Sequence, residues 1–377
     1  MLDYDLHCHS SISDGTLSPS ELVHRAAERG VKVLALTDHD DVDGLDEART
    51  AAAQHGMAFV NGVEISVTWR THTVHIVGLG IDPAYQPLAD GLRSVRSGRG
   101  ERARKMSEEL AKVGIGGVLQ GAYQYAENPN MIGRTHFARY LVETGRCKDV
   151  KSVFSRYLVK GKPGYVPHQW ASLADAVNWI CGSGGVAVLA HPGRYMVGRI
   201  SMGKKTMHEL ITEFVACGGQ AIEVVSGSHT LEQYAEFARY AAEFNLLCSC
   251  GSDFHGPAES YRDMGRLPDF PLGCTPVWQM EPLNALISGK IPSPQSSPGE
   301  ALSPTLSREG EREQTSETIV DSCGRGGELE RQSSIPAGEE AVALARRPLL
   351  NPLPQAGEEA NEKDNIQSRR ERGRGEG

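Results

Sequence analysis

The sequence predicts an α/β fold organised around a closed barrel of parallel strands. Segments with strand character alternate with amphipathic helical segments, and the alternation is repeated often enough to close a sheet on itself. The composition agrees, because 39% hydrophobic and 23% charged residues are typical of a globular chain, and 377 residues suffice for a large core.

The first hundred residues contain four predicted strands and two predicted helices. Ser18 and Pro19 mark the start of the first helix and Gly30 marks its end. The second strand is apolar until its C-terminal end, where polar residues gather. The strands are expected at 2–9, 31–40, 57–66 and 74–82, and the helices at 18–30 and 44–56.

The alternation stops at about Gly100 and resumes at about residue 172. Between them lie three amphipathic segments without strands, at 100–114, 130–145 and 148–161, which indicate a helical insertion. We expect this insertion, residues 100–170, to form a cap that binds the substrate. It divides the barrel into residues 1–99 and 171–288. Residues 289–377 are rich in Pro, Ser, Gly and Glu and are predicted to form a disordered low-complexity tail.

Charge and composition exclude several classes of function. The formal net charge of −9 offers long duplex nucleic acid no broad electrostatic attraction. No apolar run is long enough to span a membrane, and the N-terminus lacks the features of a signal peptide. The eight cysteines are scattered, which favours reduced thiols and a cytoplasmic protein. Nothing in the sequence indicates an obligate protein partner.

Imidazole and carboxylate groups occur at nearly every predicted strand, mostly at its C-terminal end. His7 and His9 are two residues apart on one strand, so both side chains point to the same side and can bind one ion. In a closed barrel these strand ends converge on one face. The candidate ligands are His7, His9, Asp14, His39, Glu64, His75, His191, Asp253 and His255.

The joint pattern predicts a metal centre, although any one of these histidines alone is better explained as a hydrogen-bonded core or surface residue. A set of imidazoles and carboxylates without cysteine suits Mn²⁺, Fe²⁺ or Zn²⁺ in a catalytic cluster. More ligands are present than one ion needs, and Glu64 is the natural bridge between ions. Neighbouring ions can share a hydroxide that attacks phosphorus in line, the usual arrangement for hydrolysis of phosphoesters.

Six motifs in this order resemble the PHP family, named for polymerase and histidinol phosphatase. They are "HCHS" with the following "DG", "TDHD", "GVEIS", "HIVGLGID", "AHPGR" and "GSDFHG", and the match runs to about residue 280. The resemblance implies a distorted (β/α)7 barrel with a trinuclear metal site that hydrolyses phosphoesters. Three Mn²⁺ ions are the expected cofactor, with Fe²⁺ or Zn²⁺ as alternatives.

The resemblance also implies how the ligands are divided among three ions, with Glu64 shared by two of them. Asp40, beside His39, is expected to orient a histidine ligand. Asp38 is expected either to do the same or to act as a structural cap. The first ion would be held by His7, His9, Glu64 and Asp253, the second by Glu64, His75 and His191, and the third by Asp14, His39 and His255.

The insertion and the phrases "GRTHFARYL" and "KGKPGYVPHQW" resemble a bacterial subgroup of nucleoside 3',5'-bisphosphate phosphatases. This implies hydrolysis of the 3'-phosphate of a small nucleotide such as 3'-phosphoadenosine 5'-phosphate, that is, a phosphoric monoester hydrolase. Three alternatives stay open: a 5'-to-3' exoribonuclease, and therefore phosphodiesterase, on short RNA oligomers, a histidinol-phosphate phosphatase, and a regulatory module like the PHP domain of some bacterial DNA polymerases. The full ligand set and the lack of a polymerase segment weigh against the last.

A second phosphate needs cations of its own, because the metal cluster can bind only one. Arg134 and Arg194 are the main candidates, since a guanidinium group suits a phosphate. His136 is balanced between a phosphate contact and helix packing. The full set of candidate substrate contacts is Arg134, Arg194, His168, Arg99 and His136. Most of Arg102, Arg104, Lys160 and Lys162 are expected to form a solvated helix face.

Overall fold

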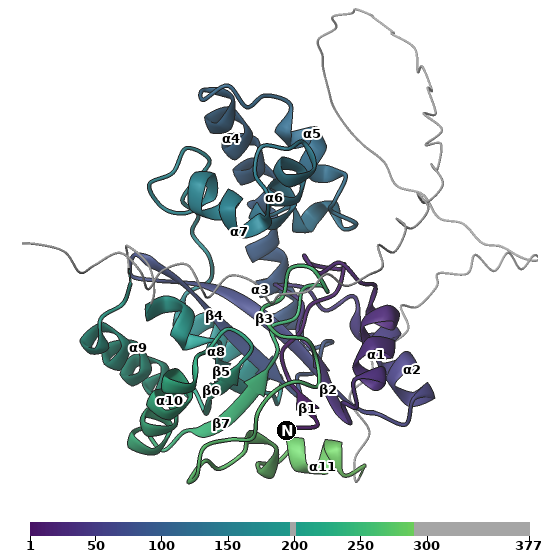
Figure 1. The fold of residues 1–377 in the computed structure, drawn as a ribbon. Coiled ribbons are helices and arrows are strands. Elements are labelled where there is room, and N and C mark those ends of the chain that lie inside the picture. The colour runs from purple at the N-terminus through teal and green to yellow at the C-terminus, as the bar shows by residue number, and fades with distance from the viewer. Residues whose placement is uncertain (197–200, 290–377) are drawn as a thin grey trace, which may run out of the picture. The chain divides into compact units, whose positions relative to one another are not determined.

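Seven strands form a single sheet in the computed structural model, which describes residues 1–196 and 201–289 (Figure 1). These residues all belong to one compact unit of the chain. The strands lie side by side in the order in which they occur in the sequence. They are β1 (Tyr4–Asp5), β2 (Val33–Leu36), β3 (Ala58–Trp69), β4 (His72–Leu79), β5 (Val186–Leu189), β6 (Ala221–Ser226) and β7 (Leu247–Gly251).

The sheet curls into a nearly closed barrel because the chain around β1 also bonds to the chain around β7. The Leu6 amide donates to the carbonyl of Cys250 over 3.1 Å, and the His9 amide donates to the carbonyl of Phe254 over 2.9 Å. The predicted barrel of seven strands is therefore confirmed. The ladder of β1 is shorter than the expected strand 2–9.

Alternate side chains of each strand face opposite sides of the barrel wall. In β2, Val33 and Ala35 belong to the apolar cluster that fills the interior, whereas Leu34 and Leu36 pack outward in the main core. The outward core is covered by helices (Figure 1). These helices are α1 (Pro19–Glu28), α2 (Leu45–Gln54), α3 (Gln86–Ser97), α8 (Leu173–Gly182), α9 (Lys204–Ala216) and α10 (Leu231–Glu243).

A short C-terminal segment closes one end of the barrel interior. Val277, in the 3-10 turn η4 (Val277–Gln279), and Leu283, in helix α11 (Leu283–Ile287), are buried in the interior cluster. Helix α11 lies near the N-terminus, at the end of the barrel away from the insertion (Figure 1). The other end of the interior is left to polar groups.

Strand β4 runs antiparallel to both of its neighbours, which corrects the expected all-parallel sheet. Only residues 70–71 separate β3 from β4, and a parallel crossover would need a dozen residues or more. Arg70 adopts a φ of 52°, in the left-handed region, to make this tight turn. Because β4 runs the other way, its N-terminal half lies beside the C-terminal ends of the parallel strands.

The helical insertion has an apolar core of its own, separate from that of the barrel. Phe137 and Leu141 are fully buried in this core, together with Leu110 and Leu158. Figure 1 shows the insertion beyond the end of the sheet that lies away from α11. Its elements are α4 (Arg99–Ala111), α5 (Val118–Tyr123), the 3-10 turn η1 (Pro129–Met131), α6 (Arg134–Glu143), α7 (Val150–Val153) and the π-helical turn η2 (Phe154–Leu158).

The structure does not test every expectation about how the chain is divided into domains. The boundaries of the insertion at 100–170 are among them, although the segment does form helices as expected. The predicted tail, 289–377, lies outside the described residues except for Gly289. No helix within the two described ranges is both long and apolar enough to cross a membrane.

Candidate metal centre

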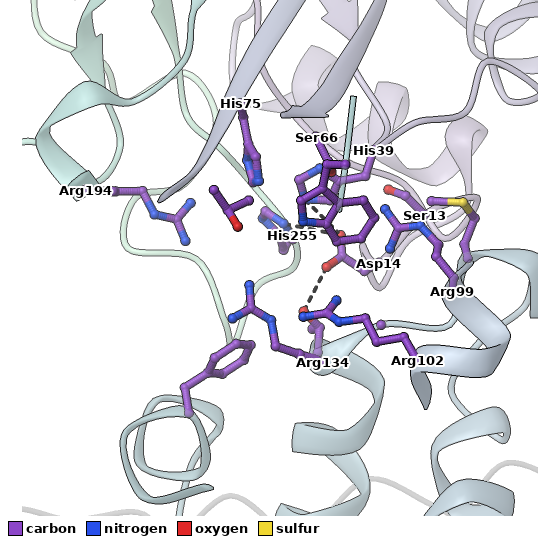
Figure 2. A pocket seen from close by; sticks show the side chains of 16 residues that line it. Ser13, Asp14, His39, Ser66, His75, Arg99, Arg102, Arg134, Arg194 and His255 are labelled. Carbon is purple, nitrogen blue, oxygen red and sulfur yellow. Dashed lines mark hydrogen bonds and ion pairs between the residues drawn. The ribbon is translucent and has the colours of Figure 1, made fainter. Parts of the chain in front are cut away.

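The nine candidate ligands meet at the barrel end that faces the insertion. Parallel strands deliver their C-terminal ends to this rim, and the reversed strand β4 delivers its N-terminal half, with His75. Figure 2 shows four of these residues, Asp14, His39, His75 and His255, around one cavity. The sequence therefore named a set of residues that the fold brings together.

Glu64 lies at the centre of this set and is fully buried. Its Oε1 lies 2.9 Å from His75 Nδ1 and 2.9 Å from His191 Nε2. Its Oε2 lies 2.8 Å from His39 Nδ1 and 3.3 Å from His9 Nε2. A carboxylate surrounded by imidazole nitrogens on both oxygens has the geometry of a bridging ligand, which is the role expected for Glu64.

His7 and His9 point toward the same place, as their spacing on an extended segment predicts. Their Nε2 atoms are 3.1 Å apart, and Asp253 Oδ1 lies 3.4 Å from His9 Nε2 and 3.8 Å from His7 Nε2. Burial, with smaller contributions from His255 and His39, lowers the pKa of His9 to about 3. A neutral imidazole keeps a lone pair for a metal ion, so His9 is suited to coordination.

Asp14 forms a second convergence point on the outer side of the cavity. Its Oδ1 lies 3.4 Å from His255 Nε2 and 3.8 Å from His39 Nε2. His255 Nδ1 donates to the carbonyl oxygen of Asp253 over 3.0 Å, which directs Nε2 toward Asp14. These contacts bring together Asp14, His39 and His255, the group that the family resemblance assigns to a third ion, and His9 has a ligand atom in the same cluster.

The residues at the rim fit divalent cations. Asp14 Oδ1, Glu64 Oε2 and Asp253 Oδ1 are buried without a hydrogen-bond partner in the described structure. Burial raises the pKa values of these carboxyls, but neighbouring cationic groups more than offset that effect and hold them well below the ordinary range. Ionised carboxylates and imidazoles without thiolates are typical ligands of Mn²⁺, Fe²⁺ and Zn²⁺. Four sets have ligand atoms within 4.8 Å of one another: His9, Asp14, His39 and His255; His7, His191 and Asp253; His7, His9 and Glu64; and His39, Glu64 and His75.

Glu223 is a functional candidate that the sequence reasoning missed. One carboxylate oxygen lies 2.5 Å from His7 Nδ1, and the other accepts the backbone N–H of His191 over 2.7 Å. Burial raises the pKa of Glu223, which is 1% exposed. The sequence signal for Glu223 is a lone acidic residue in the apolar strand "AIEVVS". Because it lies in the middle of β6, a search for polar residues at strand ends does not find it.

Among the described residues, the carboxylate of Asp40 makes its hydrogen bonds to Ser66 and Arg99 rather than to a histidine, so the expected orienting contact is not formed. The Asp40 carboxylate accepts hydrogen bonds from Ser66 N and Ser66 Oγ, at 2.7 and 2.9 Å, and forms a close ion pair with Arg99. It therefore links β3 to the first turn of α4. Asp38 acts as a structural cap, since it accepts hydrogen bonds from Ser10 and Ser13 in the loop that carries Asp14.

Several strained backbone positions lie at this rim. Of the five non-glycine residues with positive φ in the described structure, Asp40, His191 and Asp253 are at the rim, with φ angles of 49°, 28° and 55° in the left-handed region. Such conformations cost about 1–3 kcal/mol each and persist where the surrounding structure enforces them, often at functional sites. Two of the three residues are candidate metal ligands.

Four arginines line the cavity, three of them from helices α4 and α6 and the fourth, Arg194, from the chain that follows β5. Arg99, Arg102, Arg134 and Arg194 line a cavity of about 130 Å³ together with Asp14, His39, His75 and His255. Figure 2 shows their guanidinium groups around the imidazoles. Burial and the neighbouring Arg134 and Arg99 lower the pKa of Arg102 to about 9. Such a concentration of positive charge favours an anionic ligand.

Three of the five predicted substrate contacts line this cavity, and two do not. Arg134, Arg194 and Arg99 are in its wall. His168 instead packs against Trp170, with ring centroids 4.2 Å apart. His136 is 1% exposed and accepts the N–H of Gly133 over 3.0 Å, so it caps the start of helix α6.

Arg102 is an exception to the expectation that most of Arg102, Arg104, Lys160 and Lys162 are solvated. It is 8% exposed, lines the cavity and lies over the ring of Trp170 at 5.3 Å. Arg104 behaves as expected and forms exposed ion pairs with Glu101 and Glu108. Helical periodicity could not separate the two arginines, because the wall that buries Arg102 comes from distant parts of the chain.

This chain is similar to a known domain family and to proteins named as enzymes that act on phosphate esters. The model of the PHP domain matches residues 5–227. A 3',5'-nucleoside bisphosphate phosphatase from Chromobacterium violaceum is 56% identical over 279 residues, covering 74% of this chain and 96% of the relative. A 5'-3' exoribonuclease from Haemophilus influenzae is 42% identical over 276 residues, covering 73% and 98%.

Solved structures with the same fold are also found. An amidohydrolase from Chromobacterium violaceum, with bound sulfate and no metal, superposes with a TM-score of 0.72 at 52% identity and covers 78% of this chain and 99% of that one. A putative metal-dependent phosphoesterase from Bifidobacterium adolescentis gives a TM-score of 0.62 at 27% identity, covering 73% and 92%. The chain belongs to the PHP domain family.

Proposed function

We propose that this protein is a metal-dependent phosphatase that hydrolyses the 3'-phosphate of nucleoside 3',5'-bisphosphates, such as 3'-phosphoadenosine 5'-phosphate. The products are a nucleoside 5'-monophosphate and phosphate. The observation that carries the proposal is one cavity in which Asp14, His39, His75 and His255, part of the cluster of nine metal-competent groups, share the wall with four arginines. A phosphatase named for this substrate is 56% identical to the chain, which supports the choice of substrate.

The proposed cofactor is a group of three Mn²⁺ ions, with Fe²⁺ or Zn²⁺ as alternatives. His7, His9, Glu64 and Asp253 would hold one ion, and the other two would be held as the family resemblance implies. When bound, such ions activate water and neutralise the charge of the phosphoryl oxygens during in-line displacement. The crowding of imidazoles around Glu64 supports its role as the shared ligand.

The chain's own arginines would bind the second phosphate. Arg134 and Arg194 reach the cavity from different elements, one from helix α6 and one from the loop after His191 (Figure 2). A guanidinium group binds phosphate through paired N–H donors, so these residues would hold the 5'-phosphate while the 3'-phosphate lies at the metal centre. Arg99 and Arg102 add positive charge to the same wall.

A 5'-to-3' exoribonuclease acting on short RNA is the second candidate function. It is favoured by the relative from Haemophilus influenzae, which carries that name and is 42% identical to this chain. The net charge of −9 weighs against long nucleic acid but not against di- or trinucleotides. Both candidate functions use the same cavity and the same metal chemistry.

A panel of substrates with added Mn²⁺ tests the proposal. It contains 3'-phosphoadenosine 5'-phosphate, adenosine 3'-monophosphate, histidinol phosphate and a 5'-phosphorylated RNA trimer, and both released phosphate and mononucleotides are measured. We expect the highest kcat/KM for the bisphosphate. Faster release of mononucleotides from the trimer would favour the exoribonuclease, and no Mn²⁺-dependent hydrolysis of any substrate would contradict both.

A cytoplasmic location is also part of the proposal. All seven cysteines within the described residues are free thiols, which supports a reducing compartment. Fractionation of cells that produce the full chain would test the location.

A further inference from the structure

Asp14 uses its two carboxylate oxygens in different ways. Oδ1 faces the imidazoles of His255 and His39 and has no hydrogen-bond partner in the described structure. Oδ2 accepts a hydrogen bond from the hydroxyl of Thr135 over 2.8 Å. Thr135 belongs to helix α6 of the insertion, so an element outside the barrel orients a candidate metal ligand.

Arg139, one helical turn further along α6, contacts the backbone of Asp14 with its side chain. Its guanidinium group donates to the carbonyl oxygen of Asp14 over 2.6 Å and forms two hydrogen bonds with Glu259, at 2.7 and 2.9 Å. Glu259 lies in the loop that follows His255. Arg139 therefore connects the loop carrying Asp14 to the loop carrying His255.

Helix α6 is a firm support for these contacts. Residues four apart on a helix share one face, so Thr135 and Arg139 together point at the barrel rim. Phe137 and Leu141 of the same helix are fully buried in the core of the insertion. Arg139 itself is only 8% exposed. Because the other side of the helix is packed in this core, the side chains of Thr135 and Arg139 contact Asp14 from a fixed backbone.

We propose that Thr135 and Arg139 are positioning residues for the metal position formed by Asp14, His39 and His255, so that the insertion completes the metal centre as well as covering it. This inference rests on the proposed function in that it takes the rim to bind divalent ions. Thr135 directs the free oxygen of Asp14 toward the two imidazoles, and Arg139 keeps the two ligand loops together. Loss of an outer hydrogen-bond partner of this kind typically weakens metal binding about 10- to 100-fold.

The test compares Thr135→Val, which removes the hydroxyl at nearly constant volume, with Thr135→Ser, which keeps it. Chelator-stripped full-length protein is titrated with MnCl₂ by calorimetry, and the Mn²⁺ retained after gel filtration is counted. Thr144→Val is the matched control, because Thr144 is exposed at the other end of α6 and its hydroxyl bonds only to the Tyr140 carbonyl among the contacts described.

We expect one class of Mn²⁺ to bind about tenfold more weakly in Thr135→Val, with normal binding in Thr135→Ser and Thr144→Val. Equal Mn²⁺ binding by Thr135→Val and the unchanged protein would overturn the proposal. If Thr135→Val unfolds, Thr135→Ala is titrated instead, and the same two outcomes apply. A third outcome, no Mn²⁺ binding by the unchanged protein, would overturn the proposed function and this inference with it.

Kinetics provide a second readout that separates positioning from substrate binding. In Thr135→Val, we expect the Mn²⁺ concentration for half-maximal activity to rise about tenfold, while the KM for the bisphosphate at saturating Mn²⁺ stays unchanged. A rise in KM without a change in the Mn²⁺ requirement would assign Thr135 to substrate binding and overturn the positioning role. The titration needs no substrate, so an error in the proposed substrate would leave its result intact.

Discussion

Glu223, in the middle of strand β6, places its carboxylate oxygen Oε1 2.5 Å from Nδ1 of His7. Its other oxygen, Oε2, accepts the backbone N–H of His191. With Nδ1 engaged in this way, Nε2 of His7 is left facing Glu64 and Asp253. Imidazoles that bind metals commonly donate their other nitrogen to such a carboxylate. Glu223 thus orients one candidate ligand and fixes the backbone of another.

Replacing Glu223 with Gln should weaken metal binding. The amide can satisfy only one of the two donors that Glu223 accepts, so either His7 or the backbone of His191 loses its partner. We expect the Mn²⁺ concentration for half-maximal activity to rise about tenfold. Glu213→Gln is the control, because Glu213 bonds to Trp69 away from the rim. An unchanged Mn²⁺ requirement in Glu223→Gln would show that the carboxylate is not needed for orientation.

Replacing His7 and His9 together with Ala should abolish phosphatase activity without unfolding the protein. Both imidazoles point into the rim rather than into the apolar core, so the barrel keeps its packing. Activity is measured with excess Mn²⁺, folding by circular dichroism, and bound metal by elemental analysis. Activity retained by a folded double variant would refute the role of these residues in the metal centre.

Replacing Arg134 with Ala should damage hydrolysis of bisphosphates more than that of monophosphates. A hydrogen bond to a charged group contributes about 1.5–3 kcal/mol, so kcat/KM for the bisphosphate should fall about 10- to 100-fold. Arg156→Ala is the control, since Arg156 is exposed in the same insertion and lies over Tyr157, outside the cavity wall. Equal losses for bisphosphate and monophosphate would contradict the assignment of Arg134 to the second phosphate.

Acid should destabilise the metal-free protein through His136. Burial lowers the pKa of His136 to about 4, against 6.5 for an exposed histidine, because the folded protein excludes the charged form. Between pH 6.5 and pH 4 the unfolded chain binds a proton that the folded protein does not. The free energy of unfolding therefore falls as the pH drops through this window, by roughly 3 kcal/mol for this group.

Urea unfolding of the chelator-treated protein between pH 7 and pH 4 measures this dependence. His136→Asn keeps an acceptor for the N–H of Gly133 but does not titrate, so its stability should depend less on pH. The control is His208→Asn, because His208 lies on the exposed face of α9. A pH dependence in His136→Asn as steep as that of the unchanged protein would contradict the prediction.

Deleting the residues after 289 should leave catalysis unchanged. The deleted segment is rich in Pro, Ser, Gly and Glu. All of the candidate ligands and cavity residues lie before it. Activity and thermal midpoint are compared for residues 1–289 and for the full chain. Lower kcat/KM in the shortened protein would assign a role to the tail.

Much of the candidate site could be predicted because it depends on local order. Alternation along a strand places His7 and His9 on one side, and the convergence of strand ends in a barrel brings them near His39 and His255. His75 also lies at the rim, but the convergence of parallel strand ends does not explain its position. It reaches the rim because β4 is reversed by a two-residue turn.

The sequence by itself determined the order of strands and helices, the chemistry of the rim and the family resemblance, because these follow from residue type and short-range periodicity. Only the tertiary structure decided which partners orient the ligands. Glu223 and His7 are 216 residues apart, and Thr135 and Asp14 are 121 apart. Whether such pairs meet depends on how the barrel closes and where the insertion packs, and no local pattern in the chain encodes that distance.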